Sequence, residues 1–259
     1  MPIQKPNSQT APIHDVNNNY KVVRYLDIVK FLSILQNESI FFCRIDKLED
    51  KFEGTSPKPN LKIQEAFYRE LYELGELKSE NIEESIKKDV LERKEMEERF
   101  KKLCCVSCWN KFTVESYAMW KIYSNMNKGI IITSSIEKLH KAFENTSEII
   151  QLTEIKYINH ETDYIENPGN LNSPIIHKHK AYSFEEEIRL IYQVDTKDKF
   201  DYDWDSEKNK NGMNLKVNLD FLIDEVILSP YSEPWYYEMI KDLMEKYSLK
   251  KNLKYSILK

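Results

Sequence analysis

Short apolar runs and helix-like segments follow one another along this chain at uneven intervals, and this order limits the folds that it can adopt. Compact runs such as SIFFC, GIIIT and EIRLIYQV have the length and composition of buried strands. The segment 233–247 instead has the apolar period of an amphipathic helix. Because the two kinds do not alternate with a regular strand–helix–strand period, we expect an α+β fold: a mixed, mainly antiparallel sheet core with peripheral helices.

A highly charged segment interrupts this pattern. Residues 61–102 carry 10 Lys or Arg and 12 Asp or Glu, while apolar residues recur at helical spacing with a break near 75–81. We therefore expect an inserted helical hairpin, mostly solvent-facing, within a single domain over residues 20–259. The polar residues 1–19 are expected to form a disordered leader.

Composition narrows the classes of function. Only 5 glycines and no glycine-rich phosphate motif argue against a dinucleotide-binding Rossmann domain and against a P-loop. The 38 Lys and Arg against 43 Asp and Glu give no overall basic excess for nucleic acid, which is left open as a partner only through a local patch. No apolar run approaches the ~20 residues of a membrane span, so we expect a cytoplasmic protein without a membrane partner.

The cysteines do not form a recognisable metal motif. Cys104, Cys105 and Cys108 lie in one short run, and Cys43 is distant. Because no second pair follows at a suitable spacing, we expect no metal and interpret the run as buried, reduced thiols on a core strand.

The segment FEEEIRL is the strongest candidate for chemistry. On a strand, Glu185, Glu187 and Arg189 would point to one face, because side chains alternate with period two. Ile188 and Leu190 would bury the opposite face, so the charged face is either solvent-exposed with an ion pair or the wall of a cleft. Arg189 is then the cation expected between the two carboxylates.

A second group of candidates combines aromatic and polar residues. Trp109, Trp120 and Tyr123 offer flat surfaces on which a ligand can stack, and Ser107 offers a hydroxyl. An ordinary aromatic corner of the core is the alternative.

The end of the first strand and the first long loop add further candidates, namely Arg24, Tyr25, Asp50, Phe52 and Glu53. We expect one cleft to be lined by a subset of all these residues, with Glu187 as its essential carboxylate: Arg24, Ser107, Trp120, Tyr123, Glu185, Glu187 and Arg189.

Five motifs occur in a fixed order along the chain. They are Tyr25, then EDKFE at 49–53, SCW at 107–109 with MWKIY at 119–123, KAYSFEEEIR at 180–189, and DEVILSP at 224–230. This order resembles the bacterial domain-of-unknown-function family numbered twenty-nine seventy-one, over about residues 20–257 with the helical arm as an insertion. The family has no settled activity, so the resemblance implies kinship of fold.

A looser likeness is to ADP-ribosyltransferases, in the succession of a polar residue ending strand one, a central Ser or Tyr, and a late Glu on a strand. It implies NAD as substrate, no metal, and a setting in phage defence or toxin-type systems. Arg24 would hold the phosphates or ribose, and Ser107 and Tyr123 the nicotinamide half. Glu187 or Glu185 would bind a ribose hydroxyl and stabilise positive charge as nicotinamide leaves. The remaining candidates for ligand contact are Tyr25, Trp109, Trp120 and Arg189.

Two alternatives belong to other classes of function. In a metal-dependent nuclease, Asp50 with Glu185 or Glu187 would share Mg²⁺, and Lys180 or Arg189 would contact the phosphate. In a non-enzymatic module of the partner-binding or immunity type, the arm at 61–102 would bind a protein partner.

Overall fold

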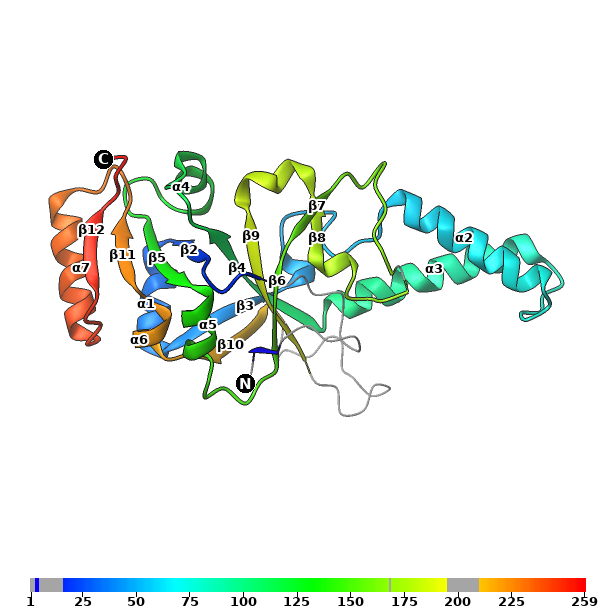
Figure 1. The fold of residues 1–259 in the computed structure, drawn as a ribbon, viewed down its shortest axis with the longest axis horizontal. Helices are drawn as coiled ribbons and strands as arrows, with labels where there is room; N and C mark the ends of the chain where they lie inside the picture. Colours follow the sequence, from blue (N-terminus) through cyan, green and yellow to red (C-terminus); the bar gives the residue numbers. More distant parts are fainter. Residues whose placement is uncertain (1–2, 5–15, 168, 195–209) are drawn as a thin grey trace.

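A computed structural model gives the structure of residues 3–4, 16–167, 169–194 and 210–259. Within these residues, ten strands form one sheet and two more form a small second sheet, with a helical hairpin extending from one end (Figure 1). The strands are β1 (Ile3–Gln4), β2 (Lys21–Leu26), β3 (Ser39–Arg44), β4 (Cys104–Lys111), β5 (Ile130–Ser135), β6 (Ile150–Glu154), β7 (Lys156–Ile158), β8 (His177–His179), β9 (Glu187–Gln193), β10 (Gly212–Lys216), β11 (Glu225–Leu228) and β12 (Asn252–Tyr255). The α-helices are α1 (Ile28–Asn37), α2 (Lys58–Glu73), α3 (Ile82–Lys101), α4 (Tyr117–Tyr123), α5 (Ile136–Ala142), α6 (Leu219–Leu222) and α7 (Pro234–Lys246), and the 3-10 helices are η1 (Ile45–Lys47), η2 (Pro174–Ile176) and η3 (Lys180–Glu185).

The main sheet has the mixed character that the sequence predicts. Its path is β1-β6-β9-β4-β2-β5-β11-β12, with β3 beside β4 and β10 beside β3. Most pairs are antiparallel, whereas β1–β6 and β11–β12 are parallel. The predicted α+β fold with a mainly antiparallel sheet and an inserted helical hairpin is therefore confirmed.

One edge of β4 is shared by two strands. β3 pairs with β4 at Cys105 and Val106, whereas β2 pairs with it at Asn110 and Lys111. Residues 107–109 of β4 therefore lie between the two pairings, where β2 and β3 diverge. We call this divergence the fork.

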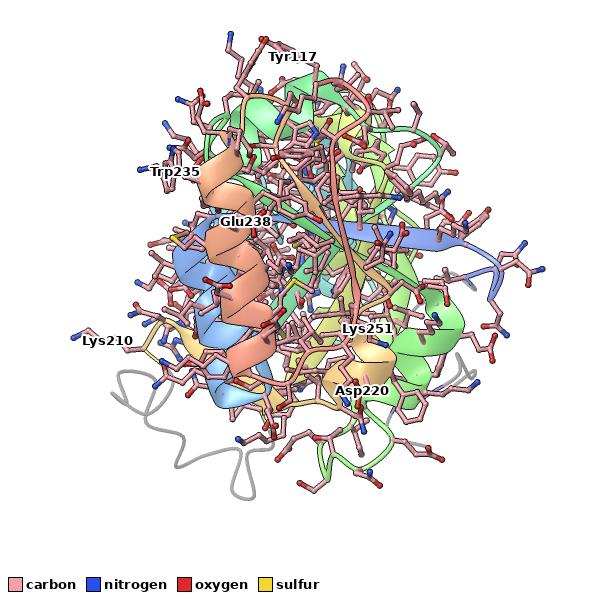
Figure 2. The ribbon with its side chains drawn as sticks, turned by 90° about the vertical axis from the view of Figure 1, so that its left-hand side faces the viewer. Tyr117, Lys210, Asp220, Trp235, Glu238 and Lys251 are labelled. Atoms are coloured by element: carbon pink, nitrogen blue, oxygen red, sulfur yellow. The ribbon has the colours of Figure 1, made fainter. Side chains whose placement is uncertain are left out.

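Helices cover both faces of the sheet. On one face α1, α5, α6 and α7 enclose the largest apolar cluster, which contains Trp109 and Ile188. On the other face Met119 and Trp120 of α4 pack on β2, β5 and β11, and η1 and η2 pack on β4 and β9. α7 lies across the β11–β12 end of the sheet, with Trp235 on its outer side (Figure 2). β9 is therefore buried on both faces, a fact that decides the environment of its charged residues.

Local sequence signals account for several element boundaries. Asp27 caps α1 by accepting a hydrogen bond from the Lys30 backbone N–H at 2.7 Å. Ser135 caps α5 in the same way through the Lys138 N–H at 3.2 Å. These side chains satisfy helix N–H groups that would otherwise lack partners.

Part of the leader predicted to be disordered is ordered instead. Ile3 and Gln4 form β1, whose partner is β6, and both Ile3 and Val16 are buried in the main core. Apolar side chains at these two positions provide the packing that a disordered segment lacks. Residues 1–2 and 5–15 lie outside the described residues.

The hairpin of α2 and α3 projects from the main sheet but is anchored at its base (Figure 1). The buried Asn60 side chain exchanges two hydrogen bonds of 2.8 Å with the backbone of Ile165. The buried Glu97 carboxylate accepts a hydrogen bond of 2.7 Å from the Ser56 hydroxyl. Apolar side chains farther out, such as Phe67, are exposed. Binding of a protein partner by this arm stays a prediction.

We expect the outer hairpin to be dispensable for folding. Deletion of residues 65–95 with a short Gly/Ser bridge should leave a core that unfolds in one cooperative transition, because the Asn60 and Glu97 bonds at the base remain. Denaturant unfolding followed by fluorescence and circular dichroism tests this. Transitions that differ between the two probes would show instead that the hairpin is integral to the core.

In the described ranges, no helix combines the length and the apolar character that crossing a membrane requires.

Candidate functional site

The fork opens into a pocket of about 360 Å³, which we call the fork pocket. Its walls come from the adjoining ends of β2, β3 and β4, the loop 48–53, α4, and the segment that contains β8 and η3. The lining residues that matter for chemistry are Arg24, Tyr25, Glu53, Tyr123, Lys178 and Glu185. Four residues predicted from sequence to line one cleft, or to contact its ligand, therefore meet here.

Arg24 is the cation of the fork. Its Nη1 donates to the Ser107 hydroxyl at 2.9 Å, and its Nη2 donates to the Phe41 carbonyl at 3.3 Å. Burial lowers the pKa of Arg24, although a guanidinium stays charged at any physiological pH. Among the described residues, no carboxylate forms an ion pair with Arg24. Within the part of the chain that the structure describes, Arg24 thus brings to the fork pocket a positive charge that belongs to no ion pair.

Tyr25, an aromatic residue of the pocket wall, is positioned by contacts with residues outside the pocket. Tyr25 packs edge-to-face on the buried Trp120, with ring centroids 5.3 Å apart. The Trp120 indole N–H donates to the Glu115 carboxylate at 3.1 Å. Glu115 also accepts hydrogen bonds from the Ser256 hydroxyl and, at 3.1 Å, from the Ile257 N–H. The last residues of the chain therefore fix the position of α4 and of the ring at the pocket wall.

Five charged side chains form a buried group at the pocket, which we call the ionic cluster: Glu53, Lys178, Glu185, Glu187 and Arg189. Lys178 Nζ donates to Glu185 Oε2 at 2.6 Å and to Glu187 Oε2 at 3.2 Å. Arg189 Nε donates to Glu187 Oε1 at 2.7 Å, and its Nη1 donates to Glu53 Oε1 at 2.5 Å. None of the five is more than 8% exposed.

Two expectations about the acidic strand are wrong. The cation between Glu185 and Glu187 is Lys178, whereas Arg189 connects Glu187 to Glu53. Of the two alternatives for the charged face, exposure to solvent does not hold, because Glu185, Glu187 and Arg189 are all buried. β9 begins only at Glu187; Glu185 ends η3, and Glu186 between them has the left-handed backbone conformation at φ 43°.

The carboxyls of the cluster have different proton affinities. Burial alone would raise the pKa of Glu187, but the positive charges of Arg189 and Lys178 outweigh it and lower this pKa to about 2. Burial raises the pKa of Glu185 despite the opposing charge of Lys178. Burial likewise raises the pKa of Glu53 despite Arg189. Glu187 is therefore a permanently charged, fully enclosed member of the cluster.

Glu185 is the member of the acidic pair that lines the pocket. Its Oε1 accepts a hydrogen bond of 2.5 Å from the Tyr123 hydroxyl. Burial, followed by this bond, raises the pKa of Tyr123, so the phenol stays protonated and remains a donor. Tyr123 on one side and Lys178 on the other thus hold the Glu185 carboxylate in one orientation.

Ring stacking positions the loop that carries Glu53. Phe52 stacks on His179, with centroids 5.0 Å apart, and on the buried His160 at 4.8 Å. Gly54 ends the loop at φ +66°, where a Cβ atom would lie 3.0 Å from the Lys101 side chain. The loop therefore brings Asp50 and Glu53 to the pocket in a fixed geometry.

The other predicted site residues lie around the pocket rather than on its wall. Trp109 faces the opposite side of the sheet and belongs to the main core, because it alternates with Cys108 along β4. Trp120 packs against the Tyr25 ring and does not line the pocket itself. Ser107 does not line the pocket either, but its hydroxyl accepts a hydrogen bond from Arg24, which does. Of the seven residues expected to line one cleft, three line the fork pocket, namely Arg24, Tyr123 and Glu185. The other four are not in its lining: Ser107, Trp120, Glu187 and Arg189.

Lys178 was missed by the sequence reasoning. A signal was available, since it follows Ile175 and Ile176, which are buried, in the run IIHKH. A lysine next to buried aliphatic residues and near three consecutive glutamates favours a buried ion pair.

The cysteines are all free, and burial raises the pKa of each thiol. In the part of the chain that the structure describes, no three His, Cys, Asp or Glu side chains are grouped as metal ligands. The carboxylate oxygens that the nuclease hypothesis assigns to Mg²⁺ at Glu185 and Glu187 already accept hydrogen bonds from Tyr123, Lys178 and Arg189.

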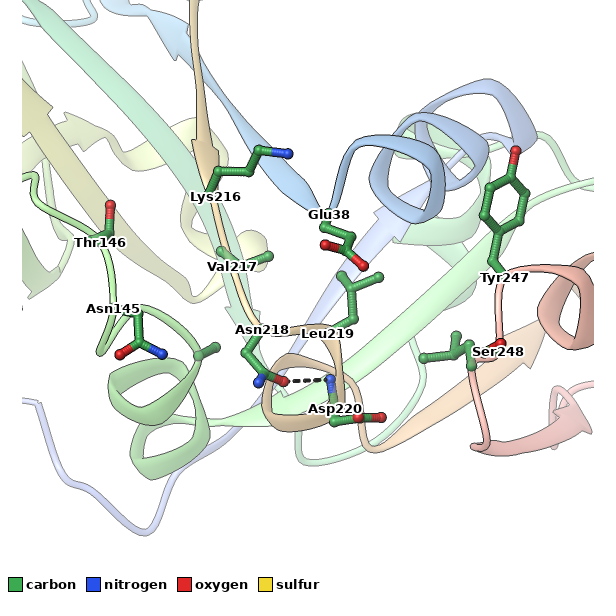
Figure 3. A pocket seen from close by; sticks show the side chains of 12 residues that line it. Glu38, Asn145, Thr146, Lys216, Val217, Asn218, Leu219, Asp220, Tyr247 and Ser248 are labelled. Atoms are coloured by element: carbon green, nitrogen blue, oxygen red, sulfur yellow. Dashed lines mark hydrogen bonds between the residues drawn. The ribbon is translucent and has the colours of Figure 1, made fainter.

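A second pocket, of about 410 Å³, lies between the end of α5, α6 and the end of α7 (Figure 3). Asn218 there caps α6 by accepting hydrogen bonds from the N–H groups of Asp220, at 2.9 Å, and Phe221. Lys216 donates to the Asn37 carbonyl at the end of α1. These polar groups serve the ends of helices, so the fork pocket remains the candidate site.

Comparison with known proteins gives a family match without an activity. Residues 119–190 match the model of a family described as protein of unknown function (DUF2971). The matched segment runs from α4 into β9 and includes Tyr123, Lys178 and Glu185, whereas Arg24 and Glu53 lie outside it. The family resemblance predicted from the motifs is confirmed over these residues, and the likeness to ADP-ribosyltransferases is not supported. No curated protein and no solved structure matches the chain.

Proposed function

We propose that this chain, with its match to the DUF2971 family, binds a phosphorylated nucleoside in the fork pocket and acts on NAD as an ADP-ribosyltransferase-like enzyme. One observation carries the proposal: the same pocket holds Arg24, a cation without a carboxylate partner among the described residues, and Glu185, a buried and oriented carboxylate. An unpaired cation and a fixed carboxylate suit a ligand with an anionic group and sugar hydroxyls.

Arg24 is suited to the phosphate. Its guanidinium has five N–H donors, and Ser107 and Phe41 account for two of them. The remaining donors have the geometry that recognises phosphate oxygens in pairs. Lys30 also lines the pocket, but it forms an ion pair with Asp27, and Glu49 and Asp50 line the same pocket, so Arg24 is the cation that we assign to the phosphate.

The remainder of the pocket suits a nucleoside. The rings of Tyr25, Tyr123 and Tyr182 offer flat faces for stacking, and Glu185 offers acceptor oxygens for ribose hydroxyls. A volume of about 360 Å³ is near the lower end of the range for ligand sites. It suits one half of a dinucleotide, so the other half of NAD would extend out of the pocket.

In the proposed reaction, Glu185 first stabilises positive charge on the ribose and then accepts a proton. The bond between ribose C1′ and the nicotinamide nitrogen breaks, and its electron pair leaves with neutral nicotinamide. The positive charge that develops on the ribose is stabilised by the Glu185 carboxylate. An acceptor nucleophile then bonds to C1′ and passes its proton to Glu185. Glu187 does not contact the ligand in this scheme, since it is fully buried and does not line the fork pocket.

Nicotinamide release from NAD tests this proposal. Glu185→Gln is expected to reduce the release rate by about 100- to 1000-fold, because one charged group at the transition state is lost. The same variant should keep a melting shift with NAD, since the amide retains the shape of the acid. The matched control is Glu161→Gln, which removes a carboxylate from an exposed pair with Lys58 and should release nicotinamide at the wild-type rate.

Two results would contradict the proposal. Wild-type protein that shows neither nicotinamide release nor a melting shift with NAD does not use this ligand. A melting shift with Mg²⁺ and none with NAD would favour the metal-dependent nuclease instead. A cytoplasmic location and a setting in phage defence or toxin-type systems stay predictions.

A further inference from the structure

The ionic cluster contains one more acidic than basic side chain. Among the described residues, the ion pairs of Glu53, Glu185 and Glu187 are with Lys178 and Arg189, and all five side chains are buried. If every group were ionised, the cluster would carry one net negative charge away from solvent. Uncompensated charge is costly in a buried environment, and it would repel an anionic ligand that approaches Arg24.

The hydrogen bonds of the cluster are unevenly distributed among the three carboxyls. Both oxygens of Glu185 and both oxygens of Glu187 accept bonds from Tyr123, Lys178 or Arg189. Glu53 Oε1 accepts from Arg189, but Oε2 is buried without a hydrogen-bond partner among the described residues. A neutral carboxyl requires less solvation than a carboxylate, so Glu53 is the member best suited to hold a proton.

We propose that Glu53 is neutral when the fork pocket binds its anionic ligand, so that ligand affinity depends on the proton of Glu53. The inference rests on the proposed function for the identity of the ligand, NAD, but not for the state of Glu53. With Glu53 neutral, the two remaining carboxylates balance Lys178 and Arg189. The positive charge of Arg24 is then not offset by an excess negative charge of the ionic cluster.

Burial and the negative charge of Glu187 favour this proton, whereas the neighbouring cations oppose it. From β9 it faces Arg189 and the negative Glu187, from β8 it faces Lys178, and α3 contributes Lys101, whose Nζ bonds the Glu53 carbonyl at 3.4 Å. Asp50 lies in the same loop and also lines the pocket. Burial is the largest influence on the pKa of Glu53 and raises it, against the lowering by Arg189.

A titration without ligand tests the proton directly. In protein labelled with ¹³C at glutamate carboxyls, the resonance missing from Glu53→Gln identifies Glu53. We expect it to titrate above the ordinary glutamate range. A Glu53 resonance that titrates at or below the ordinary range would overturn the inference, whatever the ligand proves to be.

The dependence of NAD affinity on pH tests the coupling to the ligand. As the pH rises past the pKa of Glu53, wild-type affinity should fall about tenfold per pH unit, because the ionised form must first take up a proton. Glu53→Gln mimics the neutral acid and should bind NAD with an affinity that does not change over the same range, and Glu161→Gln should follow the wild type. NAD binding that is independent of pH in wild-type protein would overturn the inference and leave the proposed function intact. Failure of NAD to bind at all would contradict the proposed function, and the carboxyl titration would still decide the state of Glu53.

Discussion

Replacing Glu187 with Gln is expected to lower the free energy of unfolding by about 3–5 kcal/mol. Glu187 is fully buried and accepts hydrogen bonds from both Arg189 and Lys178. Its amide replacement has no charge, so among the described residues the buried Arg189 guanidinium would keep only the Glu53 carboxyl and the Ile175 carbonyl as hydrogen-bond acceptors. Loss of one member of a buried ion pair is far more costly than loss of an exposed one, because the remaining charge has no solvent.

Denaturant unfolding of matched variants measures this effect. Glu225→Gln removes one partner of the half-exposed pair with Lys254 and should cost less than about 1 kcal/mol. Comparable losses for the two variants would contradict the view that burial makes Glu187 structural. A wild-type stability for Glu187→Gln, together with loss of nicotinamide release, would restore Glu187 as the essential carboxylate expected from sequence.

The stability from Glu187 should depend on pH in a defined direction. Its pKa is lowered from an ordinary value of 4.5 to about 2 in the folded protein. A lowered pKa means that the ionised form is favoured by folding, so the contribution is complete above the ordinary value. It should decline as the pH falls from 4.5 towards 2, and Glu187→Gln should lose this part of the acid dependence.

Arg24→Gln is expected to weaken NAD binding by about 100-fold while leaving the free energy of unfolding unchanged or slightly higher. The affinity loss corresponds to about 2.7 kcal/mol, as for the removal of one charged partner from an enclosed phosphate contact. The stability should not fall, because Arg24 has no carboxylate partner among the described residues and burial opposes its charge. A residue that costs stability and supports binding is typical of a functional site.

Calorimetric titration and thermal melting of the same samples separate these two effects. Arg69→Gln is the control, since Arg69 forms an exposed ion pair with Glu83 on the hairpin, outside the fork pocket. It should bind NAD as the wild type does. If Arg24→Gln binds NAD normally, the phosphate is held elsewhere. If it unfolds at a clearly lower temperature, the bond to Ser107 is structural.

Much of the fold was predictable because its signals are local. The helical hairpin follows from apolar spacing interrupted near Gly75, and the structure has a break between Glu73 and Ile82. Asp27 and Ser135 cap their helices because a side-chain oxygen can reach an N–H only three residues away. Such information is contained in a few neighbouring residues.

The candidate site was only partly predictable because its organisation is not local. The alternation rule treats residues 185–189 as one strand, but the left-handed Glu186 separates Glu185 from β9. The rule also cannot tell which elements cover a strand face, and here η2, η3 and the 48–53 loop enclose Glu187 and Arg189. Lys178 became relevant only when the parallel pairing of β7 and β8 placed it beside the acidic residues.

The pocket itself could not be predicted, since it arises from strand pairing. Arg24, which forms no ion pair with a carboxylate among the described residues, lies where β2 and β3 leave β4 at different points, and this divergence depends on register. Trp109 shows the same dependence on the exact strand position: the adjacent Cys108 lines the pocket, whereas Trp109 lies in the core.

The ionic cluster also has an evolutionary consequence. Glu53 and Arg189, which are in contact, are 136 positions apart in the chain. Each of the five side chains forms a hydrogen bond with at least one other member of the cluster. A single substitution would leave a buried charge without its partner, so changes at these positions are expected to occur in compensating combinations across relatives. Glu53, Lys178, Glu187 and Arg189 should therefore covary, and a residue that is neutral in one relative should be deleterious when transplanted alone into another.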